Sequence, residues 1–156
     1  MPFTLRTGDL NSVVTSSVEI WKEHLRTENV ALIMDLAEGL PSVKIDEEAI
    51  GEALMNLIDN AVKYGGEKKF LGLATGTSNG RAFVRIEDHG IGIAKKDSQK
   101  IFEMFYRSTE SRKEGTHGSG VGLAIVRTIM EAHGGEAAVD STPGTGSVFT
   151  LWFPLQ

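Results

Sequence analysis

Residues 46–66 carry the most regular pattern in this chain, and they limit its fold more than any other segment does. Seven apolar residues repeat there at the i, i+3, i+4 spacing of an α-helix over three turns: Ile50, Ala53, Leu54, Leu57, Ile58, Ala61 and Val62. Asp46 can cap the start of this helix, and Gly65-Gly66 can end it. The segment therefore predicts an amphipathic helix with one buried face.

Shorter patterns predict further elements on both sides of this helix. Apolar residues at helical spacing between Asp9 and about Leu25 predict a first helix capped by Asp9. The alternation from Val30 to Leu36 predicts a half-buried strand, and we expect residues 43–45 to pair with it in a hairpin. The remaining expected elements are strands at 70–77 and 81–87 around the turn dipeptide Asn79-Gly80, a helix at 121–130 closed by His133-Gly134-Gly135, and strands at 137–140 and 148–153.

Residues 88–120 show little periodicity. Loops longer than about 15 residues are uncommon inside compact domains and are usually functional or disordered. We therefore expect a mobile lid at about residues 94–119. A short aromatic cluster in this stretch, residues 101–107, is expected to pack Phe102 and Phe105 on the body of the protein.

Composition narrows the class of protein. A length of 156 residues predicts one domain, spanning 1–156. Its 16 basic and 21 acidic residues give a net charge of -5, which argues against a nucleic-acid partner. The absence of cysteine and of any apolar run of roughly 18 residues predicts a cytoplasmic location without direct membrane contact. The 18 glycines, concentrated after Gly65, indicate loops that approach a ligand closely.

Three polar side chains of the 46–66 helix form a stripe beside its apolar face. At about 100° per residue, Asn56, Asn60 and Lys63 fall on this stripe. Amide oxygens are hard ligands that suit Mg²⁺, and a lysine neutralises phosphate charge. The stripe predicts a metal and phosphate site, although two surface asparagines on a helix would give the same pattern.

Two glycine-containing segments also suggest a nucleotide. In Asp88-His89-Gly90-Ile91-Gly92-Ile93, a strand ends in an acid that can accept a hydrogen bond from an exocyclic amine such as that of adenine; an ordinary capped loop is the alternative. The segment Gly118-Ser119-Gly120-Val121-Gly122-Leu123 runs directly into a helix, whose N-terminal N–H groups can hold phosphate. It is neither a Walker loop nor a Rossmann fingerprint. Between them, Arg107 can reach a terminal phosphate when the lid closes.

Taken in order, five motifs resemble the N, G1, F, G2 and G3 boxes of histidine kinase catalytic domains. They are Asn56-x-x-x-Asn60-Ala61-x-Lys63-Tyr64, Asp88-x-Gly90-x-Gly92, Phe102-x-x-Phe105-Tyr106-Arg107, Gly118-x-Gly120-x-Gly122-Leu123 and Gly144-Thr145-Gly146. The resemblance runs from about Asp9 to Pro154. It implies an α+β fold of the Bergerat type: a two-layer α/β sandwich with a mixed, mostly antiparallel sheet of about five strands, three covering helices and a mobile ATP lid.

The resemblance also implies roles for individual residues. Asn60 is similar to the family's magnesium ligand, with Asn56 beside it. Asp88 matches the acceptor of the adenine amino group. The residues expected to contact ATP are Asn56, Asn60, Lys63, Tyr64, Asp88, Gly90, Gly92, Ile93, Phe105, Gly118, Gly120, Val121, Gly122 and Leu123. Asn56, Lys63 and Arg107 are the expected catalytic residues, with ATP and Mg²⁺ as cofactors.

One position distinguishes this chain from the gyrase-like ATPases that share the implied fold. Four residues before the magnesium asparagine those relatives carry a glutamate that acts as a base, whereas this chain has Asn56, which cannot accept a proton near neutral pH. A neutral imidazole needs no such base. The resemblance therefore favours phosphoryl transfer to a histidine over hydrolysis. His24 lacks the acid and proline that follow the family's phosphoacceptor, so we expect that histidine on a separate dimerisation domain.

Three functions stay open at this point. The first is a histidine kinase catalytic domain that acts on the histidine-bearing dimerisation domain of the same parent, from which a response regulator takes the phosphate. The others are a nucleotide-binding or docking module without transfer activity, and an ATP hydrolase that depends on Glu52. We expect this fragment to be a monomer and its parent a homodimer, with any inner-membrane anchor outside this chain.

Overall fold

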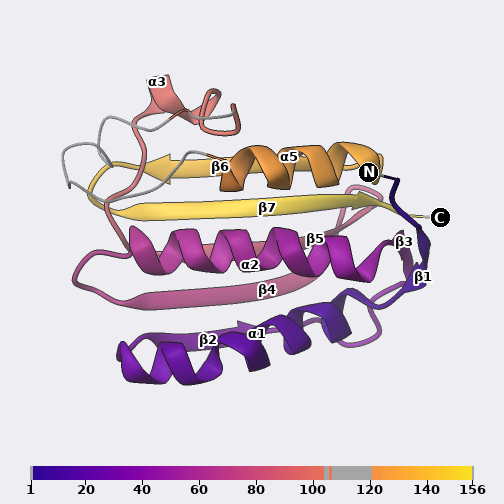
Figure 1. The fold of residues 1–156 in the computed structure, drawn as a ribbon, viewed down its shortest axis with the longest axis horizontal. Helices are drawn as coiled ribbons and strands as arrows, with labels where there is room; N and C mark the ends of the chain where they lie inside the picture. Colours follow the sequence, from indigo (N-terminus) through magenta and orange to yellow (C-terminus); the bar gives the residue numbers. More distant parts are fainter. Residues whose placement is uncertain (1, 104–105, 107–120, 156) are drawn as a thin grey trace.

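The structure is a computed structural model that describes residues 2–103, 106 and 121–155. Its elements follow one another along the chain and are drawn in Figure 1. They are β1 (Arg6–Gly8), α1 (Leu10–Thr27), β2 (Ala31–Asp35), β3 (Val43–Ile45), α2 (Glu47–Lys63), β4 (Phe70–Ser78), β5 (Arg81–Asp88), α3 (Lys95–Ser98), α5 (Gly122–Ala132), β6 (Glu136–Thr142) and β7 (Gly146–Pro154).

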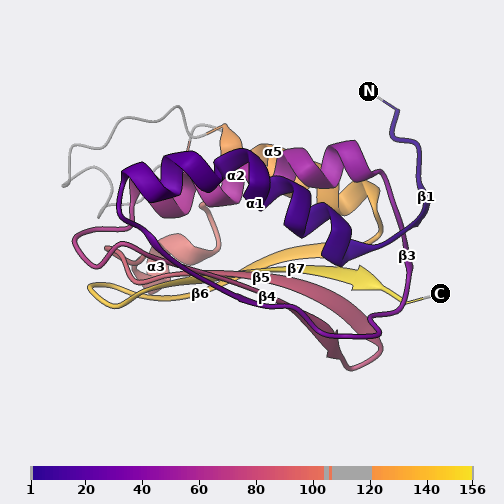
Figure 2. The same ribbon diagram turned by 90° about the horizontal axis from the view of Figure 1, so that it is seen from below.

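The described elements form two layers. A five-stranded sheet has the order β2-β4-β5-β7-β6, in which only the β2–β4 pair is parallel. The helices α1, α2 and α5 cover one face of this sheet, as Figure 2 shows. The core lies between the layers, where residues such as Leu54, Leu73 and Leu151 are almost completely buried. The expected α+β sandwich, with five strands and three covering helices, is confirmed.

Capping explains where the two longest helices begin. The Asp9 carboxylate accepts from the N–H of Asn11 at 3.0 Å before α1, and that of Asp46 accepts from the N–H of Ala49 at 3.1 Å before α2. Both caps satisfy N–H groups that a helix leaves without a partner. The strand segments at 70–77, 81–87, 137–140 and 148–153 and the helix at 121–130 also occur, with ends shifted by a few residues.

The expected hairpin between β2 and β3 is wrong. β3 pairs antiparallel with β1, a three-residue strand that the sequence patterns did not reveal, and the two form a small separate sheet. β2 instead lies parallel to β4, with α2 in the connection between them. Alternation along a strand shows that one face is buried, but it does not specify the neighbouring strand.

The first part of the expected lid contains a short helix. Residues 95–98 form the short helix α3, where Asp97 is buried, and Ile101 and Phe102 are buried directly after it. Phe102 packs edge-on against Phe149 with ring centroids 6.1 Å apart, as expected of the aromatic cluster. The Tyr106 hydroxyl donates to the Asp97 carboxylate. The rest of the predicted lid, residues 104–105 and 107–119, lies outside the described residues.

Among the described residues, no helix is both long enough and apolar enough to cross a bilayer.

Candidate nucleotide-binding site

The site begins where α2 and α5 pack side by side (Figure 1). Gly122, the first residue of α5, faces the Asn56 side chain of α2, because a Cβ atom added to Gly122 would lie 3.0 Å from Asn56 Oδ1. The Asn56 Nδ2 atom donates to the carbonyl oxygen of Glu52 at 3.0 Å. The structure therefore brings the expected metal stripe and the end of the G2 segment together.

The C-terminal end of α2 holds the loop that follows β5. Ile91 donates its N–H to the Tyr64 carbonyl oxygen at 3.1 Å. A Cβ atom on Gly90 would lie 1.8 Å from that same oxygen, so only glycine fits there. The loop expected to recognise adenine is thus fixed directly beside the helix that carries Asn60.

Two other glycines of the site also approach protein backbone closely. Gly92 has φ +71°, and a Cβ atom there would lie 2.1 Å from the Thr142 carbonyl oxygen. A Cβ atom on Gly146 would lie 2.1 Å from the Asp88 carbonyl oxygen. Close approach of Gly90 and Gly92 to a ligand stays a prediction. The carbonyl oxygens close to these two positions and to Gly146 tie the G1 and G3 segments and α2 together.

Asp88 is the most electrostatically perturbed group of this site. Its side chain is only 5% exposed, and Oδ1 accepts from the Gly90 N–H at 2.9 Å. Burial raises the pKa of the Asp88 carboxyl to about 6, while hydrogen bonds from the backbone N–H groups of Gly90 and Ser147 act in the opposite direction. A buried carboxylate held by two N–H donors is a fixed acceptor, as the adenine assignment requires.

A serine that the sequence patterns missed supports this loop. The Ser141 hydroxyl accepts from the Ile93 N–H at 2.8 Å and donates to the Gly146 carbonyl oxygen at 2.9 Å. It also lies 2.8 Å from the Ser147 hydroxyl. Ser141 comes just before Thr142-Pro143-Gly144 on β6, and its position next to the G3 box is the only sequence signal that marks it.

Asn60 and Lys63, the candidate metal and phosphate contacts on α2, differ in their surroundings. Asn60 is half-buried, and its amide makes no hydrogen bond to any other described side chain or backbone group. Lys63 pairs through Nζ with Asp59 Oδ2 at 3.0 Å, with both side chains more than 40% exposed. No cluster of three or more His, Cys, Asp or Glu residues suited to a metal ion occurs in the described part of the chain.

The start of α5 differs from the starts of α1 and α2. Its N-cap is Val121, and no side-chain cap hydrogen bond is formed there by the described residues. The N–H groups of a helix start, together with the helix dipole, favour an anion. The start of α5 is therefore a candidate phosphate contact, and Gly122 places it beside Asn56. Four other expected contacts, Phe105, Arg107, Gly118 and Gly120, fall outside the described residues.

Glu52 faces a different part of the molecule. It lines a groove of about 570 Å³ between α1 and the N-terminal half of α2, together with Ser12, Ile20, Gly51 and Met55; we call this the α1–α2 groove. Asn56, one turn further along α2, is the residue that faces α5. Glu52 is thus separated from the Asp88 loop, as its position on the helix had suggested.

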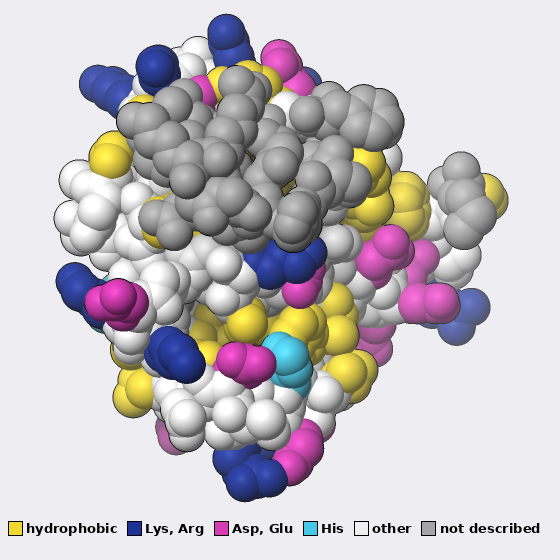
Figure 3. Space-filling view, turned by 60° about the vertical axis from the view of Figure 1, so that its left-hand side comes forward, with side chains coloured by type: hydrophobic (Ala, Val, Ile, Leu, Met, Phe, Trp, Pro, Cys, Tyr) yellow, Lys and Arg dark blue, Asp and Glu magenta, His cyan; other side chains and the backbone are white. Residues whose placement is uncertain are grey.

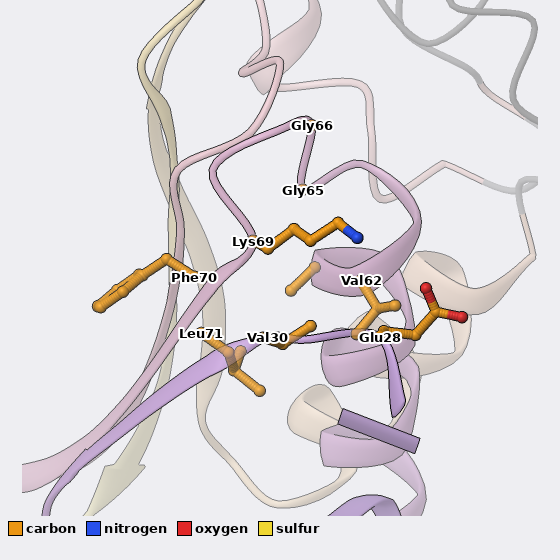
Figure 4. Close-up of a pocket in the computed structure, with 9 residues that line it drawn as sticks. Glu28, Val30, Val62, Gly65, Gly66, Lys69, Phe70 and Leu71 are labelled. Carbon is orange, nitrogen blue, oxygen red and sulfur yellow. The ribbon is translucent and has the colours of Figure 1, made fainter. Parts of the chain in front are cut away.

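A smaller pocket lies beside the C-terminal end of α2. Figure 4 shows its walls, which come from Val30, Val62, Lys69 and the neighbouring chain segments. Its volume of about 50 Å³ suits one or two water molecules rather than a nucleotide.

Figure 3 turns the left-hand side of Figure 1 forward, and on its described surface acidic and basic side chains are interspersed with hydrophobic ones.

Comparison with known proteins identifies the class of domain. The family described as Histidine kinase-, DNA gyrase B-, and HSP90-like ATPase matches residues 45–156, which include α2 and every element after it. The chain belongs to this ATPase family. The ATPase domain is 44% identical to the sensor histidine kinase YkoH of Bacillus subtilis (strain 168) over 114 residues, 73% of this chain and 25% of YkoH.

Solved histidine kinases share the whole fold of this ATPase domain. Full-length ShkA in complex with AMPPNP matches with a TM-score of 0.84 and 26% identity, over 99% of this chain and 32% of ShkA. The mycobacterial sensor histidine kinase MprB matches with a TM-score of 0.82 and 27% identity, over 97% of each chain. The chain is therefore an ATP-binding catalytic domain of the histidine kinase type, and it spans about a quarter of the length of YkoH.

Proposed function

We propose that this domain binds ATP with Mg²⁺ and transfers the γ-phosphoryl group to a histidine on a separate dimerisation domain of its parent protein. In the transfer, a bond forms between an imidazole nitrogen and the γ-phosphorus as the bond from that phosphorus to the β,γ-bridging oxygen breaks, and ADP leaves. The parent would act as a homodimer, and a response regulator would take the phosphate from the histidine.

The buried Asp88 carboxylate is the observation that carries this proposal. It is held next to α2 by the contact of Gly90 with Tyr64, and it sits in a loop closed by Ser141. Burial removes water from the Asp88 carboxylate, and this desolvation makes its charged form less favourable. A ligand amine that donates to Asp88 would recover part of this cost. The AMPPNP in the ShkA complex, a structure that shares this fold, supports the same ligand class.

Asn60 is the candidate for a magnesium contact. Its half-buried amide has no partner among the described residues, and amide oxygens suit Mg²⁺. Magnesium is commonly held by one or two protein ligands together with substrate phosphates, so the lack of an acidic cluster in the described residues fits this mode. When bound, the ion would neutralise phosphate charge. Backbone N–H groups at the start of α5 would hold the phosphates, and Lys63 and Arg107 would add charge.

The arrangement of Asn56 and Glu52 supports transfer rather than hydrolysis. Asn56 stands beside the start of α5 and cannot serve as a base, and Glu52 lines the α1–α2 groove instead. Without a base to activate water, an acceptor with its own lone pair is favoured, and neutral imidazole has one. A cytoplasmic location follows from this chemistry, because ATP is the phosphoryl donor.

A transfer experiment tests the proposal. The domain is incubated with Mg²⁺ and ATP labelled at the γ-phosphate, with and without the parent's histidine-bearing domain. The expected product is an acid-labile phosphohistidine on the added domain, reduced at least tenfold by Asn60→Ala. Nucleotide binding with no phosphohistidine under any condition would favour the docking module. Phosphate release by this chain alone, lost in Glu52→Gln, would favour the hydrolase.

A further inference from the structure

The α1–α2 groove contains a glycine that the structure does not require. Gly51 lies inside α2 with an ordinary helical backbone, and a Cβ atom there would meet no other atom within 4 Å. Glycine in a helix interior destabilises the helix relative to alanine. Since neither backbone conformation nor packing within the described chain explains Gly51, the space above it is available to something else.

The two walls of the groove carry small residues and two larger apolar side chains. Ser12, Ser16 and Ile20 are exposed and follow at i, i+4, i+8 on α1, opposite Gly51 and Met55 of α2. Ile20 is 70% exposed, more than any other large hydrophobic residue in the described chain. Small residues on both walls let another backbone approach, and Ile20 and Met55 offer apolar contact to what approaches.

The acidic lining of the α1–α2 groove favours a basic occupant. Three of its lining residues are acidic, Glu47, Glu48 and Glu52, and none is basic. None of the three forms an ion pair with another described residue. Glu47 and Glu48 lie in the first turn of α2, where acids stabilise a helix start, but Glu52 lies beyond that turn. Glu52 therefore has no evident part in the stability of the domain.

We propose that the α1–α2 groove docks a cationic amphipathic helix of a partner protein. The walls run in the same direction and lie side by side in the outer layer, as Figures 1 and 2 show, so a third helix can pack between their side-chain ridges. Residues 12–20 span about 12 Å of α1, enough for about two turns of that partner. Its apolar residues contact Ile20 and Met55 above Gly51, and flanking lysines or arginines face the three glutamates.

Peptide titration followed by backbone amide NMR tests this proposal. The probe is a helix-forming peptide of about 18 residues with leucines at i, i+3, i+4 and i+7 and lysines on both flanks. Two matched peptides replace every lysine by glutamate or every leucine by serine. We expect saturable binding of the first peptide alone, with shifts confined to residues 12–20 and 47–55. The affinity should fall as salt is raised.

Variants of the protein locate the binding and control for general effects. Gly51→Leu fills the floor of the groove from a position where an added Cβ atom meets nothing within 4 Å, and it should weaken binding at least tenfold. Glu52→Gln should weaken it about threefold. Ile33→Ser changes another exposed isoleucine on β2, and Asp140→Asn removes an exposed charge on β6; both should leave binding unchanged.

Three results would each overturn the proposal. They are no saturable binding, equal binding of the glutamate peptide, and unchanged binding by Gly51→Leu. Nucleotide affinity of the same variants, expected to be unaltered, separates this result from the proposed kinase function.

Discussion

The two halves of α2 contrast in how completely the rest of the chain covers them. The C-terminal half carries Asn56 and Tyr64 and is enclosed by α5 and the G1 loop, where Gly90 leaves no room for even one added carbon. The N-terminal half borders the α1–α2 groove, where Gly51 has open space above it. Packing thus requires a glycine at position 90, whereas no contact within the described chain requires one at position 51. The sequence alone does not distinguish these two glycines.

Gly90→Ala should have the largest effect of any change in this comparison. The new Cβ atom would lie 1.8 Å from the Tyr64 carbonyl oxygen, so the loop or the end of α2 must move. We expect a loss of about 3 kcal/mol or more in the free energy of unfolding, measured by urea denaturation. A loss below about 1 kcal/mol would show that the enclosed half is not rigidly packed.

Asp88→Asn should stabilise the nucleotide-free domain while damaging its site. Burial raises the pKa of the Asp88 carboxyl from 3.8 to about 6. A folded-state pKa above the unfolded value means that stability is fully present below about pH 4 and is lost as pH rises through about 6. The asparagine variant should therefore exceed the wild type by up to about 3 kcal/mol at pH 8, and by almost nothing at pH 4.

Urea denaturation of both proteins at pH 8, 6 and 4 measures this difference. A variant that is less stable than the wild type at pH 8 would mean that the hydrogen bonds from Gly90 and Ser147 outweigh the burial of the charge.

His133→Ala should weaken the anchoring of the N-terminal end of α2. His133 is buried at the end of α5, where Nε2 accepts from the Asp46 N–H at 2.9 Å and Nδ1 donates to the Ile129 carbonyl oxygen at 2.7 Å. Loss of these bonds leaves the Asp46 N–H without its partner and should cost about 1–3 kcal/mol. His133→Phe, which keeps a ring between Phe3 and Phe153, separates hydrogen bonding from packing. Equal stability of wild type and His133→Phe would assign the whole effect to packing.

Gly51→Ala should have the smallest effect and the opposite sign. The methyl group meets no atom within 4 Å, and alanine favours the helix by roughly 0.5–1 kcal/mol. Thermal unfolding should show a higher Tm with unchanged ATP affinity. A destabilised Gly51→Ala variant would remove the contrast with Gly90.

The sequence predicted local structure well where one pattern repeats over several turns or where a turn dipeptide is strong. The 46–66 helix with its Asp46 cap and the strands around Asn79-Gly80 occur as expected. Pairing of β2 with β4 instead of β3 was not predictable, because strand alternation records burial and not the identity of the neighbour. The three-residue β1 is too short to show any period.

The candidate site was predictable as a set of residue types but not as a set of contacts. The spacing of Asn56 and Asn60 identified the polar stripe of α2, but it did not show that Lys63 pairs with Asp59 or that Asn56 faces Gly122. The role of Ser141 depends on a turn that brings β6 and the G1 loop together, so the sequence marks this serine only by its position next to the G3 box. The charge state of Asp88 likewise depends on burial, which residues far apart in the chain create.

Calorimetric titration of the domain with ATP, with and without Mg²⁺, measures whether Asp88 recognises adenine. Wild type and Asp88→Asn are compared after both are shown to be folded. We expect wild type to bind ATP. Asp88→Asn should bind at least about a hundredfold more weakly despite its greater stability, because the carboxylate that accepts from the adenine amine has been replaced. Equal affinity of the two proteins, or no binding of adenine nucleotide by the wild type, would contradict this expectation.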